Sequence, residues 1–189
     1  MSYLKKTEYR IVPIESFTVI RNCSGCGTKA HYRNTNRFRV NANGNQLDIW
    51  LIYQCERCKH TLNLSVYERQ KAAAVPKEEY RRFLSNDEEL AKEYGRNFSF
   101  FKKNKAEIDI ENMDYRIVKL CDPKEDIKES VPGIIIIHNP YELKIRPEKQ
   151  IAEVLELSRS NVKKLMEQGR IRTELISRQS ISFVVDDLN

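Results

Sequence analysis

The chain has 189 residues, a net charge of +6 and a pI near 9.0. No apolar run approaches the roughly 20 residues of a membrane helix, and the polar first ten residues lack the apolar segment of a secretory signal. The composition therefore excludes a helical membrane protein, permits an anionic partner such as nucleic acid, and predicts a cytoplasmic protein with reduced thiols.

The first third of the chain is predicted to be β-structure built around two Cys-x-x-Cys pairs. Residues 9–21 alternate loosely in hydrophobicity and predict an entry strand that is interrupted at Pro13. Residues 38–53 predict a hairpin, because Asn43-Gly44 strongly favours a tight turn between alternating arms. Residues 61–66 predict a further strand. The two pairs that flank the hairpin are Cys23/Cys26 and Cys55/Cys58.

Four cysteines in this spacing predict a metal site. In a reducing compartment paired cysteines are metal ligands before they are disulfides, and four thiolates suit a tetrahedral zinc ion. Such a site has no open position for water, so the zinc would be structural rather than catalytic. A disulfide or redox pair and an iron site with the same ligands remain alternatives. His31 and His60 are weaker ligand candidates, for which a polar surface role is the simpler interpretation.

The middle of the chain is predicted to be helical. A short helix is expected in residues 67–74, and another in residues 76–84 with Pro76 at its first position. A third, residues 88–94, would be capped by Asn86 or Asp87 and ended by Gly95. The aromatic residues that follow are interpreted as core anchors or, alternatively, as a surface for a partner; they are Phe98, Phe100 and Phe101.

Strands are expected next at residues 106–110, 115–120 and 134–137. Between the last two lie Cys121, interpreted as a buried small residue, and residues 122–130, a charged loop or short helix.

The last third is predicted to hold a pair of helices between strands. A short strand at residues 143–145 precedes a helix that begins near residue 150. Ser158 is suited to cap a second helix, and Gly169 to end it. Strands follow from Ile171 and at residues 181–185. Basic side chains gather on and around the second helix and suit contacts to phosphates. A solvated helix face is the simpler alternative. The candidate nucleic-acid-binding residues are Arg146, Arg159, Lys163, Lys164, Arg170 and Arg172.

This last segment resembles the S4 RNA-binding domain, in which an Arg-rich start and two helices precede Gly-Arg-Val/Ile and a strand. The matching residues, in order, are Arg146, Ser158-Arg159, Lys163-Lys164-Leu165 and Gly169-Arg170-Ile171-Arg172. The segment is also similar to a helix-turn-helix, whose second helix enters the major groove of DNA. Glu156 stands where that motif prefers glycine.

The run from Phe38 to Cys58, between paired cysteines, resembles an uncharacterised bacterial family, domain of unknown function 1062. The resemblance extends over most of the chain. It implies a bacterial protein with a zinc-ribbon-like N-terminal part and supplies no activity.

Together these patterns predict an α+β protein in three consecutive parts. Residues 1–70 would form zinc-ribbon-like hairpins, residues 71–104 a helical connector, and residues 105–189 an α+β part with the S4-like helix pair in residues 142–185. The expected function is that of a zinc-binding protein that binds RNA through a basic S4-like helix. The alternatives are a helix-turn-helix-type DNA-binding regulator and a protein-interaction adaptor that binds no nucleic acid. An enzyme is the least favoured class, because no phosphate loop or Ser/His/Asp set is visible.

Overall fold

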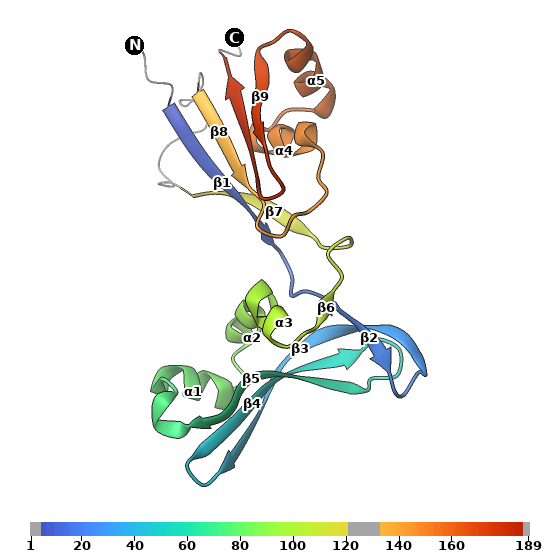
Figure 1. Cartoon of the computed structure of the whole chain (residues 1–189), viewed down its shortest axis with the longest axis vertical. Coiled ribbons are helices and arrows are strands. Elements are labelled where there is room, and N and C mark those ends of the chain that lie inside the picture. The colour runs from blue at the N-terminus through green and yellow to red at the C-terminus, as the bar shows by residue number, and fades with distance from the viewer. Residues whose placement is uncertain (1–4, 121–132, 187–189) are drawn as a thin grey trace. The chain divides into compact units, whose positions relative to one another are not determined.

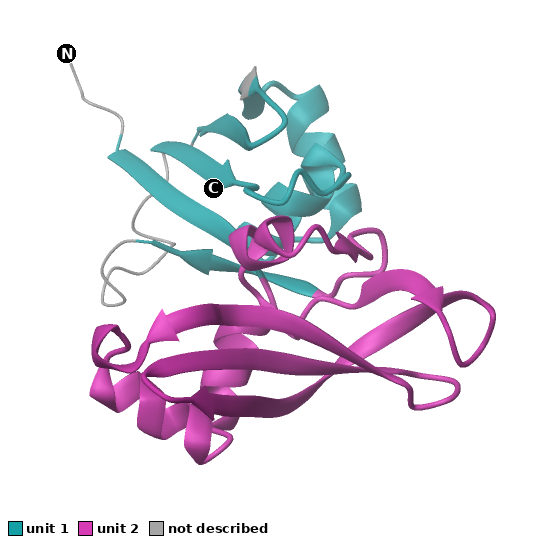
Figure 2. Cartoon of the chain, turned by 60° about the horizontal axis from the view of Figure 1, so that its bottom comes forward, with its two compact units in different colours: residues 1–12, 115–189 teal, residues 13–114 magenta. Residues whose placement is uncertain are grey.

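The computed structural model describes residues 5–120 and 133–186. Cys121 and the loop or helix expected at residues 122–130 lie outside the described residues. The described part is a mixed α+β fold with two five-stranded sheets and five α-helices, in which strands predominate. It divides into two compact units (Figures 1 and 2). Unit 1 consists of residues 1–12 and 115–189, and unit 2 consists of residues 13–114.

Unit 1 is built on a sheet with strand order β7-β1-β8-β10-β9. Its strands are β1 (Lys5–Pro13), β7 (Tyr115–Lys119), β8 (Gly133–His138), β9 (Ile171–Ile176) and β10 (Ser180–Val185). Strand β1 pairs in parallel with β8, from Lys5 opposite Gly133 to Arg10 opposite His138. Helices α4 (Pro147–Val154) and α5 (Arg159–Glu167) pack beside β9 (Figure 1).

The helix pair of unit 1 is fixed by local capping and by a small apolar core. The Ser158 hydroxyl accepts a hydrogen bond from the Asn161 amide at 3.2 Å, as expected for an N-cap. Gly169 ends the helical region with φ +73°, a conformation that favours glycine. The side chains of Ile151 and Val162 are fully buried, so each helix places one apolar face inward.

Unit 2 is built on a sheet with strand order β5-β4-β3-β2-β6. Its strands are β2 (Val19–Cys23), β3 (Thr28–Asn43), β4 (Gln46–Cys55), β5 (Thr61–Lys71) and β6 (Glu107–Ile108). A 3-10 turn (Ala72–Ala74) precedes its three helices, which are α1 (Lys77–Leu84), α2 (Glu88–Gly95) and α3 (Phe98–Lys103). The predicted turn at Asn43-Gly44 is confirmed, with Gly44 at φ +58° between β3 and β4.

The core of unit 2 lies between one face of this sheet and the three helices. Alternate residues of β4 point into it, as period-2 burial requires. Aromatic rings from the helices pack edge-on against rings of the sheet, such as Phe83 on Phe38 at 4.8 Å between centroids and Phe101 on Tyr53 at 6.0 Å. Phe100 and Phe101 are buried, as expected of core anchors, whereas Phe98 remains 41% exposed.

Three predicted elements are wrong. The single entry strand expected in residues 9–21 is two strands, β1 and β2, which belong to different sheets. The helix expected in residues 67–74 is instead the end of β5, because this stretch pairs with β4 as far as Lys71 opposite Gln46. The strand expected at residues 143–145 is a loop. There the Asn139 side chain donates to the Leu143 carbonyl at 2.9 Å and accepts from the Leu143 amide at 3.0 Å, which takes the place of strand pairing.

The division into units also differs from the three consecutive parts expected from the sequence. Strand β1, expected within residues 1–70, pairs with β8 in unit 1, and residues 105–114 belong to unit 2. Unit 2 is thus an insertion between β1 and β7. Its two ends meet, since the Ile14 amide donates to the Asp114 carbonyl at 3.0 Å.

Gly95 is the last residue of α2, and its lack of a side chain is required for packing. A Cβ placed there would lie 2.2 Å from Ser16 Oγ and 2.6 Å from Ser16 Cβ. We expect Gly95→Ala to lower the free energy of unfolding by about 2 kcal/mol, measured by urea denaturation, because the surrounding core must shift. Adding Ser16→Gly should restore part of the loss. Equal stability of Gly95→Ala and the parent protein would contradict this account.

Candidate metal centre

The four predicted metal ligands lie together at one end of the sheet of unit 2. The turn between β2 and β3 carries Cys23 and Cys26, and the turn between β4 and β5 carries Cys55 and Cys58. Because β3 pairs with both β2 and β4, the two turns are neighbours. The Glu56 amide donates to the His31 carbonyl at 3.0 Å and continues that pairing into the second turn.

The sulfur positions match a tetrahedral site. All four Sγ atoms lie within 4.8 Å of one another, with Cys23 to Cys58 at 3.4 Å and Cys26 to Cys55 at 3.8 Å. Four sulfurs at about 2.3 Å from a zinc ion would be about 3.8 Å apart. A disulfide needs about 2.05 Å, and all four cysteines are free. The arrangement is therefore compatible with a metal ion and not with disulfides.

The two Cys-x-x-Cys turns share one backbone geometry. In each, the residue after the second cysteine donates its amide to the carbonyl of the first, Gly27 to Cys23 at 2.8 Å and Lys59 to Cys55 at 3.0 Å. Both donors have positive φ, +69° and +63°. Backbone amides also donate to sulfur, that of Cys26 to Cys23 and those of Arg57 and Cys58 to Cys55. Such bonds favour thiolate over thiol.

A buried tyrosine also stabilises the thiolate form of Cys23. The hydroxyl of Tyr32, whose residue is 2% exposed, hydrogen-bonds Cys23, and this contact is the main reason that the pKa of Cys23 is lowered to about 6. The pKa of Cys26 is raised, chiefly because its thiol is hydrogen-bonded to Cys58. Sequence patterns missed Tyr32. The pairing of Tyr32 opposite Cys55 is the signal that places it there.

Glycine has two separate roles in the first turn. Gly27 supplies the positive φ, +69°, that the turn requires. Gly25 supplies space instead, because a Cβ there would lie 2.8 Å from the Sγ of Cys58. The second turn has no glycine at the position that matches Gly27, and Lys59 adopts the left-handed conformation there.

We expect Lys59→Gly to raise the free energy of unfolding of the metal-loaded protein by about 1 kcal/mol, because a non-glycine residue at φ +63° is strained. Urea denaturation with excess metal measures this. The matched control is Arg57→Gly in the same turn, which should be neutral or destabilising, since glycine adds backbone entropy to the unfolded chain. Stabilisation by both substitutions would show that relief of strain is not the cause.

The histidines lie outside the sulfur cluster. The group of ligand atoms within the described residues contains only the four cysteines, so His31 and His60 do not join it. His31 Nε2 lies 3.4 Å from Asp109 Oδ2, and His60 Nε2 lies 3.0 Å from Ser24 Oγ, which links the two turns. In unit 1, His138 Nε2 lies 2.8 Å from Glu8 Oε2.

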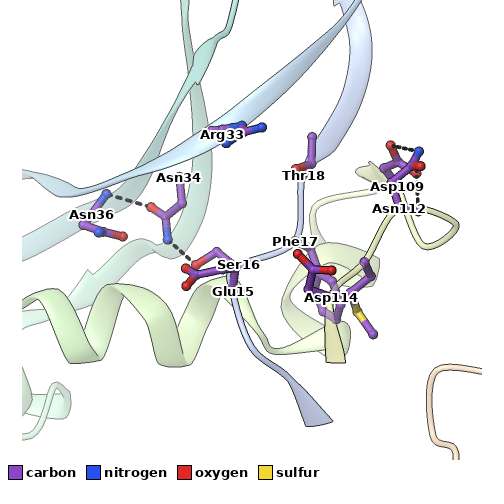
Figure 3. A pocket seen from close by; sticks show the side chains of 11 residues that line it. Glu15, Ser16, Phe17, Thr18, Arg33, Asn34, Asn36, Asp109, Asn112 and Asp114 are labelled. Carbon is purple, nitrogen blue, oxygen red and sulfur yellow. Dashed lines mark hydrogen bonds between the residues drawn. The ribbon is translucent and has the colours of Figure 1, made fainter. Parts of the chain in front are cut away.

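A second polar site is the pocket where the chain enters and leaves unit 2 (Figure 3). The Asn34 amide donates to Ser16 Oγ at 2.9 Å and to the Ala91 carbonyl at 3.0 Å, and its carbonyl accepts from the Asn36 amide at 2.9 Å. The Asn112 side-chain amide donates to both carboxylate oxygens of Asp109. Through Asn34, this network of hydrogen bonds ties Ser16 to β3 and α2, which gives the pocket a structural role.

The predicted nucleic-acid residues fall into two groups. Arg159, Lys163 and Lys164 lie exposed along α5. The other three are placed differently: Arg146 is the exposed N-cap residue of α4, Arg170 is half-buried, and Arg172 pairs with Asp186 at 2.8 Å. The structure therefore gathers half of the predicted set on one helix.

Within the described residues, no helix has the length and apolar character needed to cross a membrane. Neither the curated proteins nor the solved structures contain a match to this chain. Residues 40–176, well over half of the chain, match the model of one family. The matched segment contains the second cysteine pair, the helices α1 to α5 and the basic residues of α5. The chain belongs to this family, whose description is "Protein of unknown function (DUF1062)".

Proposed function

We propose that this chain is a zinc-stabilised protein that binds RNA through α5. The observation that carries the zinc assignment is the set of four sulfurs within 4.8 Å of one another. Cys23, Cys26, Cys55 and Cys58 would hold one Zn²⁺ as thiolates, in a zinc-ribbon-like arrangement of two turns on adjacent hairpins. All four positions are then filled by protein, so the metal has a structural role. Reduced cysteines belong to a reducing compartment, and a cytoplasmic location is part of the proposal.

The RNA-binding part of the proposal is supported by the exposed cations of α5. Within the described residues no hydrogen bond or ion pair engages the side chains of Arg159, Lys163 and Lys164, and all three are exposed. Unpaired cations on one helix suit phosphate groups, which supply most of the affinity for nucleic acid. Arg172 contributes less, because its guanidinium already pairs with Asp186.

The helix pair α4–α5 and the strand β9 after it support the S4-like interpretation of residues 142–185. The chain passes from a capped second helix through Gly169 and Arg170 into a strand, which is the order of the S4 RNA-binding domain. The strand expected before the first helix is a loop, so the likeness rests on the helices and on β9 and β10.

A helix-turn-helix regulator of DNA is the second candidate. The observation in its favour is the backbone of Glu156, in the turn between α4 and α5, which has φ +54°. This conformation favours glycine, and glycine is the residue that a helix-turn-helix prefers at this position. Against it, the described residues of unit 1 contain only these two helices, and strands flank them. The adaptor alternative is weakened, because Phe100 and Phe101 are buried and, of the aromatic residues of α3, only Phe98 is exposed, at 41%.

The test is binding of the zinc-loaded protein to labelled tRNA, an RNA stem-loop and duplex DNA, followed by fluorescence anisotropy. RNA binding should weaken steeply between about 50 and 200 mM salt, since displaced counterions drive association. Sequence-selective preference for duplex DNA would favour the second candidate. Failure to bind any of the three at low salt would refute both.

A further inference from the structure

The proposed function does not use the outer face of the sheet of unit 2. Helices α1, α2 and α3 lie together on one side of this sheet (Figures 1 and 2). They bury the inward residues of β4, among them Leu51 and Tyr53. The residues between them point to the opposite face and are half-buried; they are Asp48, Trp50, Ile52 and Gln54.

The strand pairing sets a row of arginines beside this β4 row. In the register of β3 and β4, Arg39 lies opposite Trp50, Arg37 opposite Ile52, and Arg33 opposite Gln54. Directly paired residues share a face of a sheet, so the arginines of β3 lie next to the apolar and aromatic residues of β4. On the far side of β4, Asn63 of β5 lies opposite Ile52.

The positive charge of this face is largely free. Arg37 and Arg39 are exposed, and in the described part of the chain no hydrogen bond or ion pair engages either guanidinium. Arg33 pairs with Glu56. Two cations of the helical layer are instead held in ion pairs. Arg82 pairs with Asp87 and Glu93, and Lys92 pairs with Glu88. Arg37 and Arg39 are therefore unpaired arginines on the side of the sheet away from the helices.

A depression interrupts the outer face next to the second Cys-x-x-Cys turn. It forms where the β3 pairing is irregular, between Asn34 and Arg37. Its lining includes the cations Arg33, Arg37 and Lys59, the apolar Ile52, and Glu56, whose carboxylate pairs with Arg33. Lys59 reaches this place because it follows Cys58 in the turn, so the cysteine cluster positions one of the three charges. With Arg33 paired to Glu56, Arg37 and Lys59 supply the excess positive charge of the depression, which suits a phosphate group.

We propose that this outer face binds single-stranded nucleic acid, with phosphates at Arg37, Arg39 and the Lys59 depression and an unpaired base against the Trp50 ring. Single strands expose base faces for stacking on aromatic side chains, whereas a duplex keeps its bases stacked internally. An indole beside two unpaired guanidinium groups is the pattern of such a stacking surface. The proposal goes beyond the one for α5, because it concerns the other unit and rests on none of the α5 residues.

Trp50 is the only tryptophan of the chain, so its fluorescence reports directly on this face. Titration with ten-nucleotide oligo(U) and oligo(dT) should quench Trp50. Equal quenching by both would indicate contacts to phosphates and bases, and stronger quenching by oligo(U) a further contact to the 2′-hydroxyl. Arg37→Ala with Arg39→Ala should weaken binding at least tenfold and lower the salt slope by roughly 1.4, since each lost contact to a single strand removes about 0.7.

The matched control is Lys77→Ala with Lys102→Ala, which removes the same charge from exposed positions of α1 and α3. It should bind nearly as the parent does. Arg159→Glu with Lys163→Glu should keep the Trp50 quenching even where it abolishes binding to structured RNA, which separates the two surfaces. Unquenched Trp50 at saturating oligonucleotide, or equal losses in the Arg37/Arg39 variant and its control, would overturn the proposal. Metal content and circular dichroism of each variant verify its fold.

Discussion

Replacement of Cys55 by serine is expected to unfold unit 2. Cys55 is fully buried and its Sγ lies 3.8 Å from that of Cys26. Zinc binding contributes about 10–16 kcal/mol to folding in small zinc domains, whereas the net stability of a domain is about 5–15 kcal/mol. Loss of one of four thiolates therefore removes a large part of what keeps this unit folded. Mass spectrometry of metals should find one zinc per parent chain and none in the variant, with loss of cooperative thermal unfolding.

The control for this variant is His60→Ala. His60 hydrogen-bonds Ser24 beside the cluster, yet its nitrogen is not among the ligand atoms. The variant should keep one zinc and unfold cooperatively. A Cys55→Ser protein that is metal-free and still unfolds cooperatively near the parent temperature would refute the structural role of the metal. Iron instead of zinc in the parent would keep the role and change the ion.

The reversal of two charges on α5, Arg159→Glu with Lys163→Glu, is expected to weaken RNA binding about 100-fold at 0.1 M salt. Each reversal removes one phosphate contact and adds a repulsive carboxylate, at about 1.4 kcal/mol per tenfold change in affinity. Both positions are exposed and four residues apart, on one side of the helix. Stability should change little, since the buried side chain at the centre of α5 is Val162. Anisotropy with a labelled stem-loop measures the loss.

A matched variant of the same unit is Lys144→Glu with Arg178→Glu, which makes an equal charge change at exposed positions outside α5. It should retain most of the affinity if α5 is the binding surface. Equal losses in the two variants would mean that only the net charge of unit 1 attracts RNA. Full affinity of the α5 variant would move the site away from this helix.

Much of the metal centre was predictable because its signals are local. A Cys-x-x-Cys pair needs only a tight turn to bring two sulfurs together, and Asn43-Gly44 set the hairpin that brings one pair near the other. Tyr32 and the Arg37 and Arg39 face were missed. Their roles depend on which residues of β3 lie opposite β4, and the irregularity between Asn34 and Arg37 changes that register.

The helices with clear capping signals were predicted more closely than the pairing of the sheets, whereas α3 was missed. Asp87 accepts from the Leu90 amide at 2.7 Å and Ser158 caps α5, and both are interactions within one turn. The pairing of β1 with β8 joins Lys5 to Gly133, and no local pattern encodes a partner so distant. The alanine run Ala72–Ala74 favoured a helix by propensity. The residues before it instead form the end of β5, because they pair with β4, and only a 3-10 turn follows.

The insertion of unit 2 between β1 and β7 has a consequence for the order of folding during synthesis. Unit 2 is continuous, so its sheet and metal site can form once residue 114 has emerged, before β8 has been made. Its folding joins Ile14 to Asp114 and shortens the free loop between β1 and β8 from roughly 120 to roughly 20 residues, which lowers the entropic cost of closure by about 1.5 kcal/mol. Under the proposed function, a shortage of zinc during translation would therefore delay the folding of unit 1 as well as that of unit 2.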